Sequence, residues 1–225
     1  MTSPAGRTRP RRRPAPGRPQ ILQVALDLID REGAQALTMR RLAEELGTSP
    51  MSLYGNVIDR DDVLDGLYDL ILREVDLSGA DDLPWQQWVR RAWGSYRAAL
   101  LRHPNALTAI MRRPLATTPG MAYSAATELP LRVFRNAGLS PDAAVHAYRM
   151  LNAFVFGTTV VEANFLERHS VLADRRSVIL PVGNFPNLTE ALPFFLQPDF
   201  EGTYELGLTL LIQGLEQTIG ADRDA

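Results

Sequence analysis

The sequence of 225 residues contains no cysteine and no lysine, and it has only three histidines. Without cysteine, disulfides and thiolate metal sites are excluded. The histidines, His103, His146 and His169, are too far apart for an HxxxH or HExxH motif, so we expect no metal site and no cofactor. No apolar run reaches the roughly 18 to 20 residues of a membrane span, and the N-terminus lacks the apolar core of a signal peptide. We therefore expect a cytoplasmic protein without membrane contact.

Motifs of catalytic chemistry are also missing. The chain has no nucleophile elbow, no phosphate-cradling glycine loop and no cluster of carboxylates on one helix face. Two adjacent acidic pairs, Asp61–Asp62 and Asp81–Asp82, lie at a helix start and in a loop, where solvated caps explain them. An α-helical enzyme is the alternative that these absences oppose, and we expect no enzymatic activity.

Charge is divided unevenly along the chain. The first 60 residues contain ten arginines and six acidic residues, a net charge of +4, whereas the rest contains 14 arginines and 20 acidic residues, a net charge of −6. Only the basic part is suited to meet a polyanion. Residues 1–18 are rich in proline, glycine and arginine, so we expect a disordered basic arm. Its run Arg9–Arg13 suits phosphates or a minor groove, or serves as a solubilising tail.

The stretch Thr38–Val57 predicts two short helices joined by a tight turn. Thr38 is placed to cap the first helix, Met39–Leu46, by accepting a hydrogen bond from a backbone N–H. Gly47 follows directly, where a helix end favours a residue that adopts a left-handed backbone.

The second short helix is expected to open at Ser49, with Pro50 at its first position, where the missing N–H does no harm. Leu53 and Val57 would form its buried face. The side chains left outside are small or hydrogen-bonding, the kind that fit base edges and phosphates. The pattern indicates a helix-turn-helix, and the alternative is an ordinary helix–glycine–helix corner of an all-α protein.

The rest of the chain is helical in pattern, so we expect an all-α protein. It combines a basic arm (1–18), a three-helix helix-turn-helix DNA-binding domain (19–75) and a larger α-helical ligand-binding and dimerisation domain (84–220). A loop is expected over residues 168–185, and Pro130 should kink or split the helix that contains it. The other expected helices are Gln20–Glu32, Arg60–Val75, Pro84–Arg102, Asn105–Arg112, one within Thr118–Ala137, Pro141 to about Glu167, Pro186–Phe195 and Asp199–Ile219.

This organisation resembles the TetR-type family of transcriptional regulators, with a body similar to that of the tetracycline repressors. In the DNA-binding domain (the head), the resemblance rests on Ala25, Gly33, Leu37–Ala43, Gly47, Ser52–Val57, Arg60, Asp61 and Leu64. The body carries it through Trp85, Arg97–Asn105, Arg113–Pro114 and Gly138–Ser140.

The resemblance implies contacts with a palindromic double-stranded DNA operator. Arg40 and Ser52 would reach bases or phosphates, and Tyr54 and Arg60 would reach phosphates. The chain departs from the family at Gly55 and Asn56, where an aromatic or long residue followed by His or Tyr is more usual. Our candidate DNA-binding residues are Thr38, Arg40, Thr48, Ser49, Ser52, Tyr54, Gly55, Asn56 and Arg60.

The body is expected to bind a small hydrophobic effector. Aromatic side chains with few polar groups are typical of small-molecule sites, although an aromatic stripe at helical spacing is also typical of a core. His103 is either a ligand contact or a helix cap before Pro104. Tetracycline repressors hold a magnesium-bound drug through a histidine that is absent from Leu107–Ile110, so we expect a different effector. The candidate ligand-binding residues are Trp88, Trp93, Tyr96, His103, Asn152 and Phe156.

We therefore expect a homodimeric transcriptional regulator, a repressor released from its operator by a small molecule. The alternative is a DNA-binding regulator whose body is a protein-docking or dimerisation module and binds no small molecule. The helices from Pro141 and Asp199 are the expected subunit interface, because a helix that is apolar nearly all round must be covered on both sides.

Overall fold

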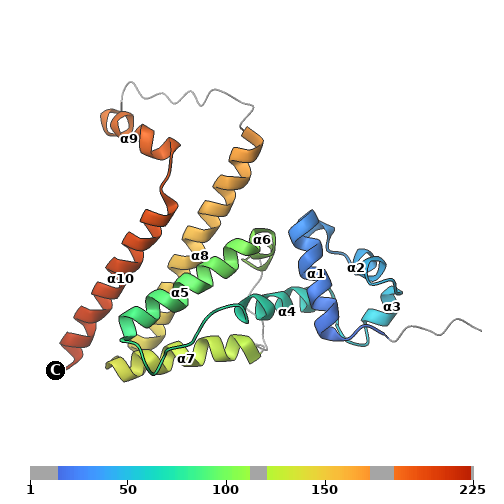
Figure 1. The fold of residues 1–225 in the computed structure, drawn as a ribbon, viewed down its shortest axis with the longest axis horizontal. Coiled ribbons are helices and arrows are strands. Elements are labelled where there is room, and N and C mark those ends of the chain that lie inside the picture. The colour runs from blue at the N-terminus through green and yellow to red at the C-terminus, as the bar shows by residue number, and fades with distance from the viewer. Residues whose placement is uncertain (1–14, 112–120, 173–184, 224–225) are drawn as a thin grey trace, which may run out of the picture. The chain divides into compact units, whose positions relative to one another are not determined.

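The computed structural model describes residues 15–111, 121–172 and 185–223 (Figure 1). Every regular element in this part of the chain is helical, as predicted. A 3-10 helix, η1, spans Ala34–Ala36. The α-helices are α1 (Arg18–Glu32), α2 (Met39–Glu45), α3 (Pro50–Leu53), α4 (Arg60–Leu72), α5 (Trp85–Arg102), α6 (Pro104–Met111), α7 (Met121–Ala137), α8 (Pro141–Leu172), α9 (Pro186–Leu196) and α10 (Phe200–Arg223).

The chain divides into two compact units that meet between Leu67 and Tyr68, inside α4. The sequence places the end of the DNA-binding domain later, at residue 75. The end of α4, from Tyr68 to Leu72, belongs to the second unit, where Tyr68 and Leu72 line a cavity. None of the described helices combines the length and the apolar character of a membrane span.

The first unit encloses a small apolar core. Leu28, Leu42 and Leu53 have no exposed surface. α1 and α4 approach closely at Gly66, where a β-carbon would lie 2.5 Å from Cδ2 of Leu22. The buried residues of α1 recur at helical spacing, so one face of the helix covers this core: Ile21, Leu22, Ala25, Leu26, Leu28 and Ile29.

The second unit is organised around α8, which packs against α5, α6, α7 and α10. Figure 1 shows α8 and α10 as two long helices. They approach closely at Gly207, where a β-carbon would lie 2.4 Å from the Phe154 ring. Arg97 of α5 forms ion pairs of 2.7 Å with Glu162 of α8 and with Glu201 of α10. Apolar packing and one shared cation therefore join the three helices.

Several helix ends differ from the expected ones. α3 stops at Leu53, and Val57 is buried from the turn that follows rather than from the helix itself. Gly55 and Asn56, both weak helix formers, explain the early stop. α4 ends at Leu72 instead of Val75, and residues 73–75 continue as hydrogen-bonded turns.

Helices α7 and α8 also differ from expectation. α7 is one continuous helix that contains Pro130 as a buried residue, so the proline does not split it. α8 runs five residues beyond the expected end at Glu167, to Leu172, so the start of the expected loop is helical. The rest of that loop, residues 173–184, lies outside the described residues, as does the arm over residues 1–14.

Candidate DNA-binding surface and ligand cavity

The corner between α2 and α3 has the local structure that the sequence predicts. The Thr38 hydroxyl accepts a hydrogen bond of 3.1 Å from the Arg41 backbone N–H and so caps α2. Gly47 adopts a positive φ of 62° directly after the helix, a conformation that glycine reaches without steric cost. The Thr48 N–H then donates to the Ala43 carbonyl at 2.9 Å and closes the turn.

Most side chains expected to contact DNA point into solvent. The Arg40 side chain is 85% exposed, and its ion pair with Glu44 spans 3.6 Å. Tyr54 is 49% exposed. The Ser49 and Ser52 hydroxyls lie 3.0 Å apart at the start of α3. The four residues lie on the surface of α2 or α3 or directly beside α3, and their contacts with DNA stay a prediction.

The same surface has open positions and apolar side chains. No atom lies within 4 Å of the place that a β-carbon on Gly55 would take, and Thr48 is half-buried. Met51 and Ile58 are each 78% exposed, although neither is among the expected contacts. Ile58 could have been found from the sequence as an apolar residue outside the buried spacing of α3 and α4.

Two expected contact residues already have partners within this unit. The Arg60 guanidinium donates to the backbone carbonyls of Leu37 at 2.9 Å and Ala34 at 3.1 Å. The Asn56 amide donates to the Pro16 carbonyl at 3.1 Å. Both side chains thus hold neighbouring segments of the first unit, and their DNA contacts stay predictions.

An ion pair between Arg18 and Asp62, which we call the clamp, joins the start of α1 to α4. Arg18 donates to both carboxylate oxygens of Asp62, at 2.8 and 2.7 Å. Asp62 Oδ2 also accepts from the Ile58 backbone N–H at 2.8 Å. The hydrogen bond from Arg18 is the main reason that the pKa of Asp62 lies below its ordinary value. This clamp holds the chain at the point where the expected basic arm ends and α1 begins.

A ring of charges explains why Arg40 and its neighbour Arg41 differ. Arg41 pairs with Glu32 at 2.9 Å and with Glu45 at 2.6 Å. Arg31 pairs with the same two carboxylates at 2.9 and 2.8 Å. The hydrogen bonds from Arg41 and Arg31 lower the pKa of Glu32. Arg41 is therefore committed to joining α1 and α2, whereas Arg40 is exposed.

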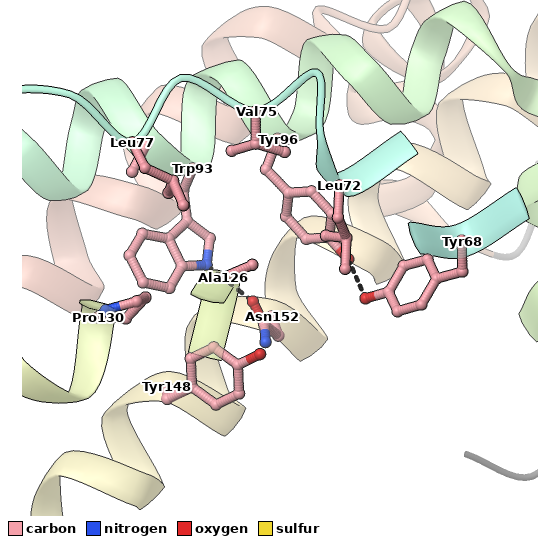
Figure 2. Close-up of a pocket in the computed structure, with 11 residues that line it drawn as sticks. Tyr68, Leu72, Val75, Leu77, Trp93, Tyr96, Ala126, Pro130, Tyr148 and Asn152 are labelled. Atoms are coloured by element: carbon pink, nitrogen blue, oxygen red, sulfur yellow. Dashed lines mark hydrogen bonds between the residues drawn. The ribbon is translucent and has the colours of Figure 1, made fainter. Parts of the chain in front are cut away.

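A cavity lies within the second unit, between residues of α4, α5, α7 and α8 (Figure 2). It contains about 340 Å³ of space not filled by atoms, part of it open solvent. Its apolar lining consists of Leu72, Val75, Leu77, Ala92, Ala126 and Pro130. Its polar groups belong to Tyr68, Trp93, Tyr96, Tyr148 and Asn152.

Hydrogen bonds hold these polar groups in place. The Tyr68 and Tyr96 hydroxyls lie 2.9 Å apart, and the Trp93 indole N–H donates to Oδ1 of Asn152 at 3.1 Å (Figure 2). The Tyr148 hydroxyl lies 2.9 Å from Oγ1 of Thr127. Burial raises the pKa of Tyr68, Tyr96 and Tyr148. All three hydroxyls are therefore protonated at neutral pH.

The structure places three of the six expected ligand residues in the wall: Trp93, Tyr96 and Asn152. The other three lie outside it. Trp88 is fully buried behind Trp93, edge-on at a centroid distance of 6.0 Å. Phe156 packs edge-on against Tyr96 at 5.5 Å. His103 is the C-cap residue of α5, with Nε2 3.0 Å from a Glu74 carboxylate oxygen.

Two tyrosines of the wall, Tyr68 and Tyr148, are not among the residues predicted from the sequence. Tyr148 lies four residues before Asn152 on α8, so the two share one helix face, and this spacing could have identified it. Tyr68 lies four residues before Leu72 on α4. It is hard to find because its helix is read as a core element of the head. Among the described residues, no group of three His, Asp or Glu side chains could hold a metal ion.

Comparison with known proteins relates both units to one family. A model described as "Bacterial regulatory proteins, tetR family" matches residues 21–63. A model described as "Tetracyclin repressor-like, C-terminal domain" matches residues 78–219. The first range contains the helix-turn-helix, and the second contains most of the cavity wall.

Individual relatives cover nearly the whole chain. The tetracycline repressor protein class D of Escherichia coli is 30% identical over 216 residues, which cover 92% of this chain and 95% of that protein. The structure of the Streptomyces coelicolor TetR family protein ActR in complex with actinorhodin matches with a TM-score of 0.76 and 30% identity, covering 89% of this chain and 95% of that one. A structure of BioQ with its double-stranded DNA operator matches with a TM-score of 0.64 and 26% identity, covering 89% of this chain and 98% of that one.

Proposed function

Because the chain belongs to the TetR family of bacterial regulatory proteins, we propose that it is a homodimeric transcriptional repressor that a small-molecule ligand releases from operator DNA. The main support for this proposal is that a helix-turn-helix unit and a unit with a cavity follow each other on one chain, and that each matches a model of the same family. The relatives include a structure with a bound ligand and one with a bound operator. We infer both properties for this chain.

The exposed side of the helix-turn-helix supports operator binding. α3 lies at the surface with Ser49, Ser52 and Tyr54 beside it, and Arg40 extends from α2 into solvent. Hydroxyl and guanidinium groups bind phosphates and base edges in the major groove. A second copy would present the same surface to a second half-site, about one helical turn of DNA away or a multiple of it, which fits a palindromic operator.

Exposed apolar side chains on α8 and α10 support the homodimer. Val161 and Leu166 of α8 are 61% and 56% exposed, and Leu206 and Leu210 of α10 are 62% and 59% exposed. The two helices pack against each other, so these side chains extend an apolar surface of one unit. Such surfaces mark sites of association, and a second copy of the same chain would cover them.

Helix α4 provides a route between ligand and DNA. At its start, Arg60 holds the carbonyls of Leu37 and Ala34 in the first unit. Near its end, Tyr68 and Leu72 line the cavity of the second unit. A ligand with higher affinity for one position of α4 shifts the population toward that position. The distance between the two α3 helices of the dimer then no longer matches the distance between successive major grooves, and the operator is released.

Operator binding is tested with Arg40→Ala and Tyr54→Ala, by footprinting and mobility shift on the DNA that flanks the protein's own gene. We expect each change to weaken binding by about 10- to 100-fold, as for lost base or phosphate contacts. Unfolding in urea should be unchanged because both side chains are exposed.

Arg132→Ala is the matched control. It removes one exposed arginine from the second unit, where Arg132 pairs with Asp81 at 2.7 Å, and it should leave DNA binding intact. Equal binding by Arg40→Ala, Tyr54→Ala and the wild type would contradict the assigned surface. Addition of a ligand that binds the cavity should remove the footprint.

A further inference from the structure

Some hydrogen-bond donors of the cavity wall have no acceptor within the described part of the protein. Tyr68 and Tyr96 contact each other through their hydroxyl oxygens at 2.9 Å (Figure 2). Only one of the two hydroxyl protons can lie between these oxygens. Since burial raises the pKa of both groups, both protons are present at neutral pH. The pair therefore has one O–H donor to offer to a bound molecule.

Asn152 supplies a second donor. Its Oδ1 accepts from the Trp93 indole N–H at 3.1 Å, so the orientation of the amide is set and its NH₂ group faces away from Trp93. Figure 2 shows this nitrogen beside the Tyr148 hydroxyl. The amide carries two N–H donors, and the Tyr148 oxygen could take only one of them, so at least one is available to a bound molecule.

Tyr148 offers no donor of its own. Thr127 Oγ1 donates its single proton to the Tyr123 carbonyl at 2.9 Å. The contact of 2.9 Å between Thr127 Oγ1 and the Tyr148 hydroxyl therefore has Tyr148 as donor. The proton of Tyr148 is therefore used in its hydrogen bond to Thr127.

The wall is also uncharged. None of the described residues that line the cavity is Arg, His, Asp or Glu. An ionised group placed there would lose its hydration without gaining a counter-charge, which is costly. Aromatic side chains such as Trp93 and Tyr96 favour a flat aromatic partner. The wall thus disfavours ionised carboxylates and ammonium groups, and its open donors require an acceptor on the bound molecule.

We propose that the effector is an uncharged aromatic compound whose carbonyl oxygen accepts from the Tyr68–Tyr96 pair and the Asn152 amide. This inference rests on the proposed function, because it names the chemical class that the same cavity takes. A carbonyl satisfies the donors that the wall leaves open, whereas a plain hydrocarbon would bury them unsatisfied.

Three probes of similar size test the class by isothermal titration of the full chain. 2-Acetylnaphthalene is a neutral ketone, 2-isopropylnaphthalene is a matched hydrocarbon without an acceptor, and 2-naphthoate is the matched carboxylate. We expect the ketone to bind about tenfold or more tightly than the hydrocarbon, because the hydrocarbon leaves buried donors unpaired. The affinity for the ketone should also exceed the affinity for the carboxylate by a similar factor. Equal affinities, tighter binding of the carboxylate, or no binding of the ketone would overturn the proposal.

The double variant Tyr68→Phe/Tyr96→Phe removes both hydroxyls and keeps the rings. We expect the ratio of ketone to hydrocarbon affinity to fall to about threefold or less. Tyr123→Phe is the control, because its ring lies 6.1 Å from that of Tyr68 but outside the cavity wall. It should keep the wild-type ratio. The ratio is unaffected by a loss of folded protein, which lowers both apparent affinities together, and an unchanged ratio in the double variant would overturn the proposal.

Failure of the ligand class and failure of the proposed function give different results. Operator binding is measured by mobility shift without any probe. A chain that binds its operator but shows no preference for the ketone refutes the ligand class alone. A chain that prefers the ketone but binds no DNA refutes the proposed function and leaves the assignment of the cavity standing.

Discussion

In the first unit, the candidate site residues lie on the surface and within one stretch, from Thr38 to Arg60. In the second unit, the cavity wall takes residues from four helices, spread from Tyr68 to Asn152. Arg40 is 85% exposed, whereas Trp93 is 3% exposed. A surface site depends on side chains that the core does not use. A cavity depends on side chains that also hold the core together.

This difference has a consequence for mutations. Replacing an exposed contact residue should remove function and leave stability unchanged, because few native contacts are lost. Replacing a residue of the cavity wall should cost stability as well as binding, since the same atoms fill the interior. The two units can therefore be separated experimentally by measuring unfolding and binding on the same variants.

The largest effect is expected from Trp93→Ala. This side chain is buried against Trp88 and Phe134 and donates to Asn152. Its loss should lower the free energy of unfolding by about 3–5 kcal/mol, measured in urea at matched protein concentration. Tyr54→Ala in the first unit should change it by less than about 0.5 kcal/mol. Equal losses in the two variants would break the comparison between an exposed and a buried site.

A smaller effect is expected at the cap of α2. Thr38→Ala removes the hydroxyl that accepts from the Arg41 N–H, and it should destabilise the protein by about 1 kcal/mol. Thr38→Ser keeps a capping hydroxyl and should lose much less. The measurement is urea unfolding followed by circular dichroism. If serine and alanine destabilise equally, the hydroxyl of residue 38 does not stabilise the helix-turn-helix corner.

The smallest effect is expected from Asp62→Asn, which tests the long-range clamp of the first unit. Arg18 and Asp62 are 44 residues apart in the chain, so this contact joins distant parts of the first unit. We expect a loss of about 1 kcal/mol or less at neutral pH, as for a partly exposed ion pair.

The pH dependence of the unfolding free energy tests whether the Asp62 carboxylate charge stabilises the protein through Arg18. The pKa of Asp62 is lowered in the folded protein, so its contribution is complete above the unfolded pKa of about 4 and is lost as pH falls through the lower folded value. The stability gap between the wild type and Asp62→Asn should therefore be widest above about pH 5 and narrow below pH 4. Chemical unfolding at a series of pH values measures this gap. A gap that is constant with pH would mean that the carboxylate charge is not involved.

Local patterns predicted the helix-turn-helix well. Thr38 caps α2, Gly47 has a positive φ, and Pro50 opens α3, because each effect involves residues only a few positions apart. The length of α3 was overestimated, since a buried Val57 reads as part of a helix even when it follows a turn. Partners of Asn56 and Arg60 could not be foreseen, because Pro16 and Leu37 reach them only through the fold.

The cavity was predicted less completely. The aromatic stripe that includes Trp88, Trp93 and Tyr96 was typical of either a core or a ligand site. All three side chains are buried, but a buried face can meet either another helix or an empty space. Trp93 and Tyr96 face the cavity, whereas Trp88 packs behind Trp93. Helical spacing is the same for both outcomes, so the sequence could not separate them.

The sequence by itself determined an all-α chain with a capped helix-turn-helix near its basic end, because caps, glycines and apolar spacing act over one or two helical turns. Only the tertiary structure decided which groups form the ligand site. The Tyr68–Tyr96 contact and the Trp93–Asn152 hydrogen bond join residues 28 and 59 positions apart. Such contacts depend on how α4, α5 and α8 pack, and no local pattern records that packing.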